Sequence, residues 1–281
     1  MRRRFRLGRQ ISVRLRESLL NVAAVALLIL LIVIVWNAVS MRGVKISAAD
    51  AAAMRAPAAP VLALAEMAER ANADFAEVLA LYMLDNGFFR KAVTPVEDKA
   101  LQTRYIDGRK SLRRRLGAKA VETYAAWFRL MLDEIACFPV QGVGFIYGDS
   151  FGAATANGMY TSIDIYDRER TEGRLRVVSM ARGVVTETGC SNADGWYVLV
   201  RTAAGTVYRY AHLAYLSADI AAGTVVAAGS TLGYMGDTGT DGLNALLPVR
   251  LAVSVCVDVA ALPAQTKVNP YIFLRLVETD E

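Results

Sequence analysis

This 281-residue chain holds few histidine and cysteine side chains, the nitrogen and sulfur ligands on which a catalytic zinc site usually depends. There is one histidine, His212, and there are three cysteines, Cys137, Cys190 and Cys256, which are widely spaced and form no Cys-x-x-Cys pair. A catalytic zinc ion needs about three protein ligands and an open position for water. One histidine is too few for a histidine-based zinc site. His212 can be a hydrogen-bonded structural residue, or it can act alone as an acid or base. The cysteines can remain thiols or supply one disulfide.

Two further segments could bind an anion. The glycine-rich residues 233–242 could cradle a phosphate, but they contain no lysine and no helical pattern follows them, so we interpret them as turns. The stretch from Arg104 to Arg115 is basic. We interpret it as the solvent-exposed face of a helix rather than a phosphate site.

The net charge of +5 lies at the N-terminus. Residues 1–18 hold seven arginines and one acidic residue, so the remainder is nearly neutral and we expect no nucleic-acid binding. Residues 19–39 are long enough to span a bilayer, and Asn21 is the only polar side chain between Leu19 and Trp36. This run is longer than the apolar core of a signal peptide, and no small-residue cleavage site follows it. We predict a cytoplasmic basic tail, 1–18, and a single transmembrane helix, 19–39, with the C-terminal part outside the cytoplasm.

Residues 44–137 predict a helical region next to the membrane. They are rich in Ala, Leu, Glu and Arg and contain only three of the 21 glycines. Asp74 and Glu77 are a candidate capping pair, and Asn86-Gly87 is a candidate helix end. Two apolar stripes recur at helical spacing. They consist of Phe75, Val78, Leu79, Tyr82 and Met83, and of Val121, Tyr124, Phe128, Met131, Leu132 and Ile135.

Residues 138–281 predict a mainly β domain. They hold 16 of the 21 glycines, and these separate short runs of β-forming residues, a pattern typical of a sandwich or barrel. The runs are Arg176–Met180, Gly183–Thr188, Trp196–Arg201, Thr206–Ala211, Thr224–Ala227 and Val249–Val259.

Six segments of this region, in order, carry a resemblance to a known family. They are FPV at 138–140, YGDSFGA at 147–153, VVSMARGVVTETG at 177–189, GTVYRYAHL at 205–213, IAAGTVVAAGSTLGYMGDTG at 220–239 and VNPYIFL at 268–274. Together they resemble the M23 (LytM-type) zinc metallopeptidases, which cleave peptide cross-bridges in bacterial cell walls. The resemblance implies antiparallel β-sheets around a groove, similar to a duplicated hybrid motif, with 268–274 as the closing strand.

The resemblance also locates the zinc ligands of the family, and most are missing here. The H-x-x-x-D segment aligns with residues 160–164, so Asp164 is kept and Tyr160 replaces a histidine. The H-x-H strand aligns with residues 250–252, where Arg250 and Ala252 replace both histidines. The ligand positions thus hold Tyr160, Asp164 and Ala252, and we expect neither bound zinc nor another cofactor.

The remaining groove residues suggest a different chemistry. His212 and Asp164 are remnants of a catalytic set that is no longer intact. A guanidinium in place of an imidazole would neutralise an acid left without its metal, so we predict that Arg250 pairs with Asp164. Tyr160, Asp164, His212 and Arg250 would then form a mixed polar floor suited to binding a peptide.

We interpret the chain as a membrane-anchored, catalytically inactive M23-family protein. Its groove would bind cell-wall peptide or an envelope protein partner, in peptidoglycan or sporulation processes. Inactive relatives include septal activators of wall amidases and sporulation stage II protein Q, whose single membrane helix is similar to the layout here. The alternative is an active zinc endopeptidase with unusual ligands that hydrolyses peptidoglycan cross-bridges. In a third interpretation the helical region, 44–137, carries the interaction.

Overall fold

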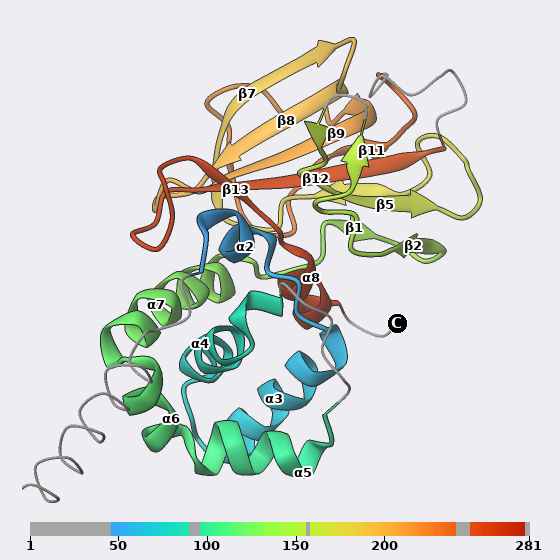
Figure 1. Cartoon of the computed structure of the whole chain (residues 1–281). Coiled ribbons are helices and arrows are strands. Elements are labelled where there is room, and N and C mark those ends of the chain that lie inside the picture. The colour runs from blue at the N-terminus through green and yellow to red at the C-terminus, as the bar shows by residue number, and fades with distance from the viewer. Residues whose placement is uncertain (1–45, 90–95, 156–157, 240–247, 279–281) are drawn as a thin grey trace, which may run out of the picture. The chain divides into compact units, whose positions relative to one another are not determined.

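The computed structural model describes residues 46–89, 96–155, 158–239 and 248–278 (Figure 1). The predicted basic tail, 1–18, and transmembrane helix, 19–39, lie outside these residues. Within the described ranges no helix combines the length and the apolar character that crossing a membrane requires. Residues 46–281 form one compact unit.

The first part of this unit is helical as far as Glu134. Its elements are α2 (Ala48–Ala53), α3 (Ala58–Arg70), α4 (Phe75–Asp85), the 3-10 turn η1 (Gly87–Phe89), α5 (Asp98–Leu101), the π-helical turn η2 (Gln102–Asp107), α6 (Arg109–Leu116) and α7 (Ala118–Glu134).

The two predicted apolar stripes lie on α4 and α7, which pack against each other. Asp74 caps α4 by accepting a hydrogen bond from the Ala76 N–H at 3.0 Å, which confirms its half of the predicted capping pair, whereas Glu77 pairs with Arg113. The basic stretch forms ion pairs with α4, because Arg104 and Arg115 both contact the buried carboxylate of Asp85. Most of the remaining surface of these arginines faces solvent, as the sequence indicates.

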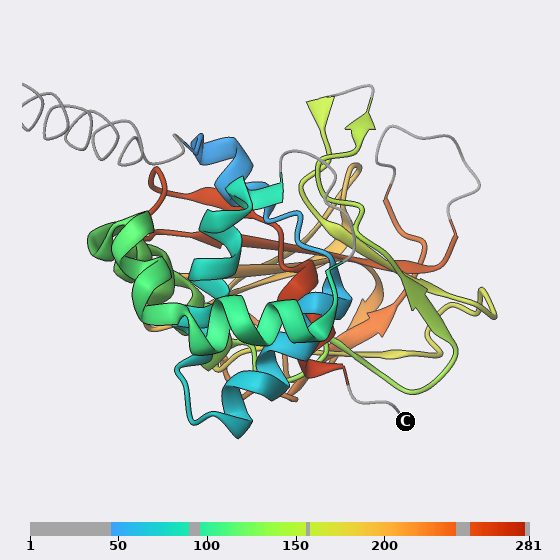
Figure 2. The same ribbon diagram turned by 60° about the horizontal axis from the view of Figure 1, so that its bottom comes forward.

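The second part is an antiparallel sheet of eleven strands among the described residues. Seven of them are paired in the order β1-β6-β11-β9-β12-β5-β2. A branch leaves this row at β9, which also pairs with β8, and β8 is followed by β7 and β10. The strand β13 pairs with β12, and β3 and β4 form a separate hairpin that stands clear of the sheet (Figure 2). The strands are β1 (Val140–Gln141), β2 (Phe145–Tyr147), β3 (Ala154–Thr155), β4 (Gly158–Met159), β5 (Ile163–Asp167), β6 (Arg176–Val178), β7 (Gly183–Ser191), β8 (Gly195–Arg201), β9 (Val207–Leu216), β10 (Val225–Val226), β11 (Thr231–Met235), β12 (Arg250–Val257) and β13 (Thr266–Val268).

The end of the chain departs from the sequence prediction. The expected closing strand at 268–274 is wrong, because β13 ends at Val268 and the helix α8 (Tyr271–Val277) follows. Asn269 starts this helix by accepting a hydrogen bond from the Tyr271 N–H at 3.0 Å. The helix then buries Phe273, whose ring lies 6.4 Å from that of Phe128 on α7.

The helical and β parts share one hydrophobic core. Tyr208 of β9 is fully buried and donates a hydrogen bond to Glu134 of α7 at 3.0 Å. Asn269 holds α2 from the β side, because its N–H donates to the Ala52 carbonyl and its side-chain amide donates to the Ala53 carbonyl, both at 2.8 Å. The predicted boundary at 137/138 is therefore a change of secondary structure within one core.

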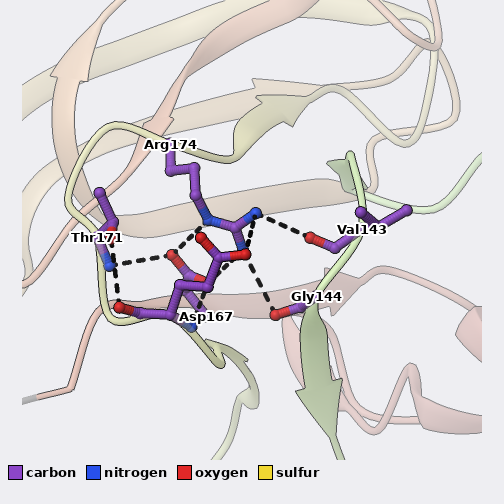
Figure 3. A network of polar contacts seen from close by, with 6 residues as sticks. Val143, Gly144, Asp167, Thr171 and Arg174 are labelled. Atoms are coloured by element: carbon purple, nitrogen blue, oxygen red, sulfur yellow. Dashed lines mark hydrogen bonds and ion pairs between the residues drawn. The ribbon is translucent and has the colours of Figure 1, made fainter.

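A buried ion pair closes the turn between β5 and β6 (Figure 3). The carboxylate of Asp167 is fully buried, binds the Arg174 guanidinium and accepts backbone N–H bonds from Glu169 and Thr171. Arg174 also donates to the Val143 carbonyl at 3.0 Å. Burial alone would raise the pKa of Asp167, but Arg174 and the two N–H donors outweigh burial and hold that pKa below its usual value.

Replacing Asp167→Asn should lower the free energy of unfolding of the full-length chain by about 1.5–3 kcal/mol at pH 7, because the buried carboxylate would lose its charged hydrogen bonds from Arg174. Since the folded-state pKa of Asp167 is lowered, its contribution is present above the unfolded pKa, about 4, and is lost as the pH falls below it. Urea unfolding should show that the difference in free energy of unfolding between the variant and the unmodified chain becomes smaller from pH 7 to pH 3. Glu169→Gln, an exposed partner of the same arginine, should cost less than about 1 kcal/mol. A difference in free energy of unfolding that stays constant with pH would contradict a role for the charge of Asp167.

Candidate functional site

A groove of about 790 Å³ lies over β5, β9 and β12 and is flanked by the β3–β4 hairpin. All five residues that the sequence places at the M23 site line it, namely Tyr160, Asp164, His212, Arg250 and Ala252. Strand register explains why they meet. Ala252 lies directly opposite Asp164 on β5 and opposite Ala211 on β9, so the three positions share one face of the sheet.

His212 lies where β9 changes its neighbour. Residues 207–211 of β9 pair with β12, whereas residues 213–216 pair with β11. At His212 the backbone has φ 64°, in the left-handed region, and the register with β8 shifts at the same point. The histidine therefore lies in a β-bulge, a feature that re-aims a side chain, here toward the groove.

Asp164 is held by hydroxyl and guanidinium groups. Tyr160 donates a hydrogen bond to Oδ1 at 2.5 Å, and Tyr166 donates one to Oδ2 at 3.1 Å. Arg250 Nε lies 3.8 Å from Oδ1. The ion pair predicted from the sequence is thus present, with two tyrosine hydroxyls added to it.

The contacts of His212 define its tautomer. Nδ1 lies 2.8 Å from the Thr238 carbonyl oxygen, which can only accept, so Nδ1 carries the proton. Nε2 lies 3.0 Å from a guanidinium nitrogen of Arg250, which can only donate, so Nε2 is unprotonated. His212 is therefore neutral and both ring nitrogens are engaged, which leaves neither nitrogen for proton transfer with a ligand.

Thr238 reaches His212 because of a close backbone approach. At Gly195, with φ 59°, an added Cβ would lie 2.1 Å from Thr238 Oγ1, so only glycine fits there. Thr238 Oγ1 accepts a hydrogen bond from the Trp196 N–H at 3.0 Å and donates one to the Leu213 carbonyl at 2.6 Å. The interpretation of 233–242 as turns is wrong for residues 233–235, which belong to β11, and residues 240–242 lie outside the described residues. The part played by Thr238 was not predictable without the fold.

The floor of the groove is closed to solvent. Asp164, His212 and Arg250 are exposed by only 8%, 1% and 3%. Tyr160 is half-buried, and Met159 on the hairpin is 65% exposed. A ligand would therefore contact Tyr160 and Met159 directly, whereas Arg250 would act through the residues that it holds. Sequence reasoning missed Met159, because an exposed methionine carries no signal in a single sequence.

The rim of the groove carries a second ion pair that the sequence analysis also missed. Arg209 of β9 contacts the carboxylate of Asp194, and both residues line the groove. Burial alone would raise the pKa of Asp194, but the hydrogen bond from Arg209 and the one from Ser191 hold it below its usual value. The two charges of this rim pair therefore compensate each other.

The donor set of the floor does not fit a zinc ion. Zinc binds nitrogen, sulfur or carboxylate ligands, usually three from the protein at a catalytic site. Here Asp164 is already paired with a guanidinium, the Tyr160 hydroxyl is donated to that same carboxylate, and Ala252 offers only a methyl group. Across the described residues, no three His, Cys, Asp or Glu side chains come together in a group that could hold a metal. All three cysteines are free thiols.

Comparison with known sequences supports the class of fold. Residues 158–254 match peptidase family M23 and span the groove from β4 to β12. This part of the chain is an M23 peptidase domain, so the resemblance inferred from the six segments is confirmed. No curated protein matches the chain at a significant level.

Solved structures extend the likeness beyond this domain. A LytM-type protein of Ruminococcus gnavus, assigned as a glycyl-glycine endopeptidase, is 25% identical, covers 85% of this chain and 95% of its own, and superposes with a TM-score of 0.64. Because residues 138–281 make up only about half of this chain, an aligned share of 85% must also include residues of the helical part. Lysostaphin of Staphylococcus simulans is 23% identical over 48% of this chain and 50% of its own, with a TM-score of 0.38. A chain of the SpoIIIAH–SpoIIQ complex is 16% identical over 50% of this chain and 96% of its own, with a TM-score of 0.37.

Because His212 is the only histidine, its ring can be observed directly in the full-length protein. Long-range ¹H–¹⁵N NMR at neutral pH should show one imidazole with a protonated Nδ1 and an unprotonated Nε2. Gly195→Ala should disturb this signal and destabilise the fold, because its Cβ would collide with Thr238. Gly205→Ala is the matched control, since Gly205 also has a positive φ but nothing lies within 4 Å of its added Cβ. An imidazole protonated at Nε2 would contradict the assigned contacts.

Proposed function

We propose that this chain is a membrane-anchored, non-hydrolytic protein of the M23 fold whose groove binds an extended peptide. The peptide would come from the cell wall or from an envelope protein partner. One observation carries the proposal: Asp164, the acid that would hold the family's zinc, is buried in an ion pair with Arg250 and in hydrogen bonds with two tyrosines. The floor is thus satisfied without a metal, and the groove above it remains.

The groove has the features that peptide binding needs. Its volume is sufficient for several side chains, and it combines apolar surface at Met159 with hydroxyl and amide groups such as Tyr160 and Asn192. The rigid, interlocked floor fixes Tyr160 in one orientation through its bond to Asp164. A preorganised aromatic side chain is a typical anchor at a binding site.

Hydrolysis of peptidoglycan cross-bridges is the competing function. It is favoured by the M23 domain match and by the likeness to the Ruminococcus gnavus protein. It requires a metal or another means of activating water, which the described floor does not offer to a ligand. Zinc analysis of the purified full-length chain separates the two functions, because an active enzyme of this family would carry the ion in stoichiometric amount.

The purified full-length chain should leave cross-linked wall peptides intact even with added zinc. The reason is that His212 has both nitrogens engaged and that Asp164 is committed to Arg250. Product release should be followed by chromatography. Cleavage that is abolished by a chelator and by His212→Ala would rule out the non-hydrolytic assignment.

Tyr160→Ser should weaken peptide or partner binding by about 1–3 kcal/mol, the range expected for an aromatic anchor. The measurement is calorimetry or fluorescence anisotropy with muropeptides or with a captured envelope partner. Tyr215→Ser provides the control, because Tyr215 is 51% exposed and does not line the groove. Equal affinities for both variants would show that the interaction lies elsewhere, and the helical region would then be the next candidate.

The arginine asymmetry around residues 19–39 leads us to propose a single-pass topology with a cytoplasmic N-terminus. Protease added to intact cells without their wall should digest the region after residue 39 and spare the N-terminal tail. Immunoblotting with tags at both ends distinguishes the products. A protected C-terminal tag would reverse the orientation.

A further inference from the structure

Arg250 lies beside Asp164, the carboxylate that the M23 resemblance assigns as a zinc ligand. It lies opposite Tyr166 on β5, and its neighbour Ala252 lies opposite Asp164. Its guanidinium joins the two remnants of the site, with Nε 3.8 Å from Asp164 Oδ1 and another nitrogen 3.0 Å from His212 Nε2. The side chain is almost completely buried.

We infer that the Arg250 guanidinium is the built-in cation of this groove, which takes over the charge of the metal and excludes a metal from Asp164. It balances the buried carboxylate, as a metal would, and it engages the imidazole nitrogen that could otherwise act as a ligand. Arg250 is thus a positioning residue that makes the floor independent of metal. This inference deepens the proposed function and rests on the assignment of the groove as its binding site.

Geometry gives the inference a measurable consequence. A zinc ion bound to Asp164 Oδ1 at about 2.1 Å would lie within about 6 Å of Arg250 Nε. At that distance, in a buried site, a divalent cation and a guanidinium repel each other strongly. Restoring the missing ligands should therefore fail to restore zinc binding for as long as Arg250 remains.

An alternative is that Arg250 is only a structural ion-pair partner that would move aside for a metal. In that case the missing ligands alone would explain the absence of a zinc site. The two interpretations differ in what happens when ligands are added with Arg250 left in place.

The test compares variants of the full-length chain by calorimetric titration with ZnCl₂. The double variant Tyr160→His, Ala252→His restores two ligand positions and keeps Arg250. Adding Arg250→Gln removes the guanidinium charge and should tighten zinc binding by at least about 100-fold. Adding Arg250→Lys instead keeps a charge and should leave binding as weak as in the double variant.

A matched control removes a positive charge from the same groove at another place. Arg209→Gln, added to the double variant, takes away the rim cation that pairs with Asp194 and should leave zinc affinity within about threefold of the double variant. Thermal unfolding with and without zinc checks that every variant folds. The Arg250→Gln variant should have a low melting temperature that zinc raises, because zinc would replace the lost charge.

Tight zinc binding by the double variant with Arg250 present would overturn the inference. A triple variant with Arg250→Gln that stays unfolded in excess zinc would also overturn it, since a metal could then not take over the role of Arg250. Neither result bears on peptide binding, which is measured on chains that keep Arg250 and Ala252 and carry no added histidine. Failure of the inference is therefore distinguishable from failure of the proposed function.

Discussion

Burying a carboxylate inside a protein costs several kcal/mol unless a counter-charge and hydrogen bonds compensate it. In this protein Asp164 imposes that requirement on the groove, and the surrounding residues meet it. Arg250 supplies the charge, while Tyr160 and Tyr166 supply hydroxyl donors. His212 is drawn into the same arrangement through Arg250, and its tautomer follows from it. The chemical character of the groove is thus a consequence of how one acid is neutralised.

The sequence predicts much of the site because the M23 segments are ordered along the chain and because strand register is regular. Once residues 160–164 and 250–252 are placed on paired strands, the meeting of Asp164 with Ala252 and of Arg250 with Tyr166 follows from antiparallel pairing. The apolar stripes on α4 and α7 are equally predictable, since helical periodicity is a local signal.

Other features depend on contacts distant in sequence and could not be predicted from the chain alone. The carbonyl of Thr238 reaches His212 only because Gly195 allows two segments to approach closely. The segment 268–274 contains β-forming residues, yet Asn269 and the apolar pocket around Phe128 favour a helix there. Exposure of Met159 and burial of Arg250 likewise depend on how the hairpin and the sheet pack. In the segment 268–274 tertiary structure overrides a local β preference.

The contact between α2 and Asn269 also connects the helical part to the groove. The Asn269 side chain binds the Ala53 carbonyl at 2.8 Å and Asp149 at 2.9 Å, and the next residue, Ser150, accepts a hydrogen bond from the Asp164 N–H at 3.0 Å. A short path of hydrogen bonds and one peptide link thus runs from α2, the first helix that the structure describes, to Asp164 in the groove. The backbone of Asp164 is therefore linked to α2 by direct hydrogen bonds as well as through the sheet.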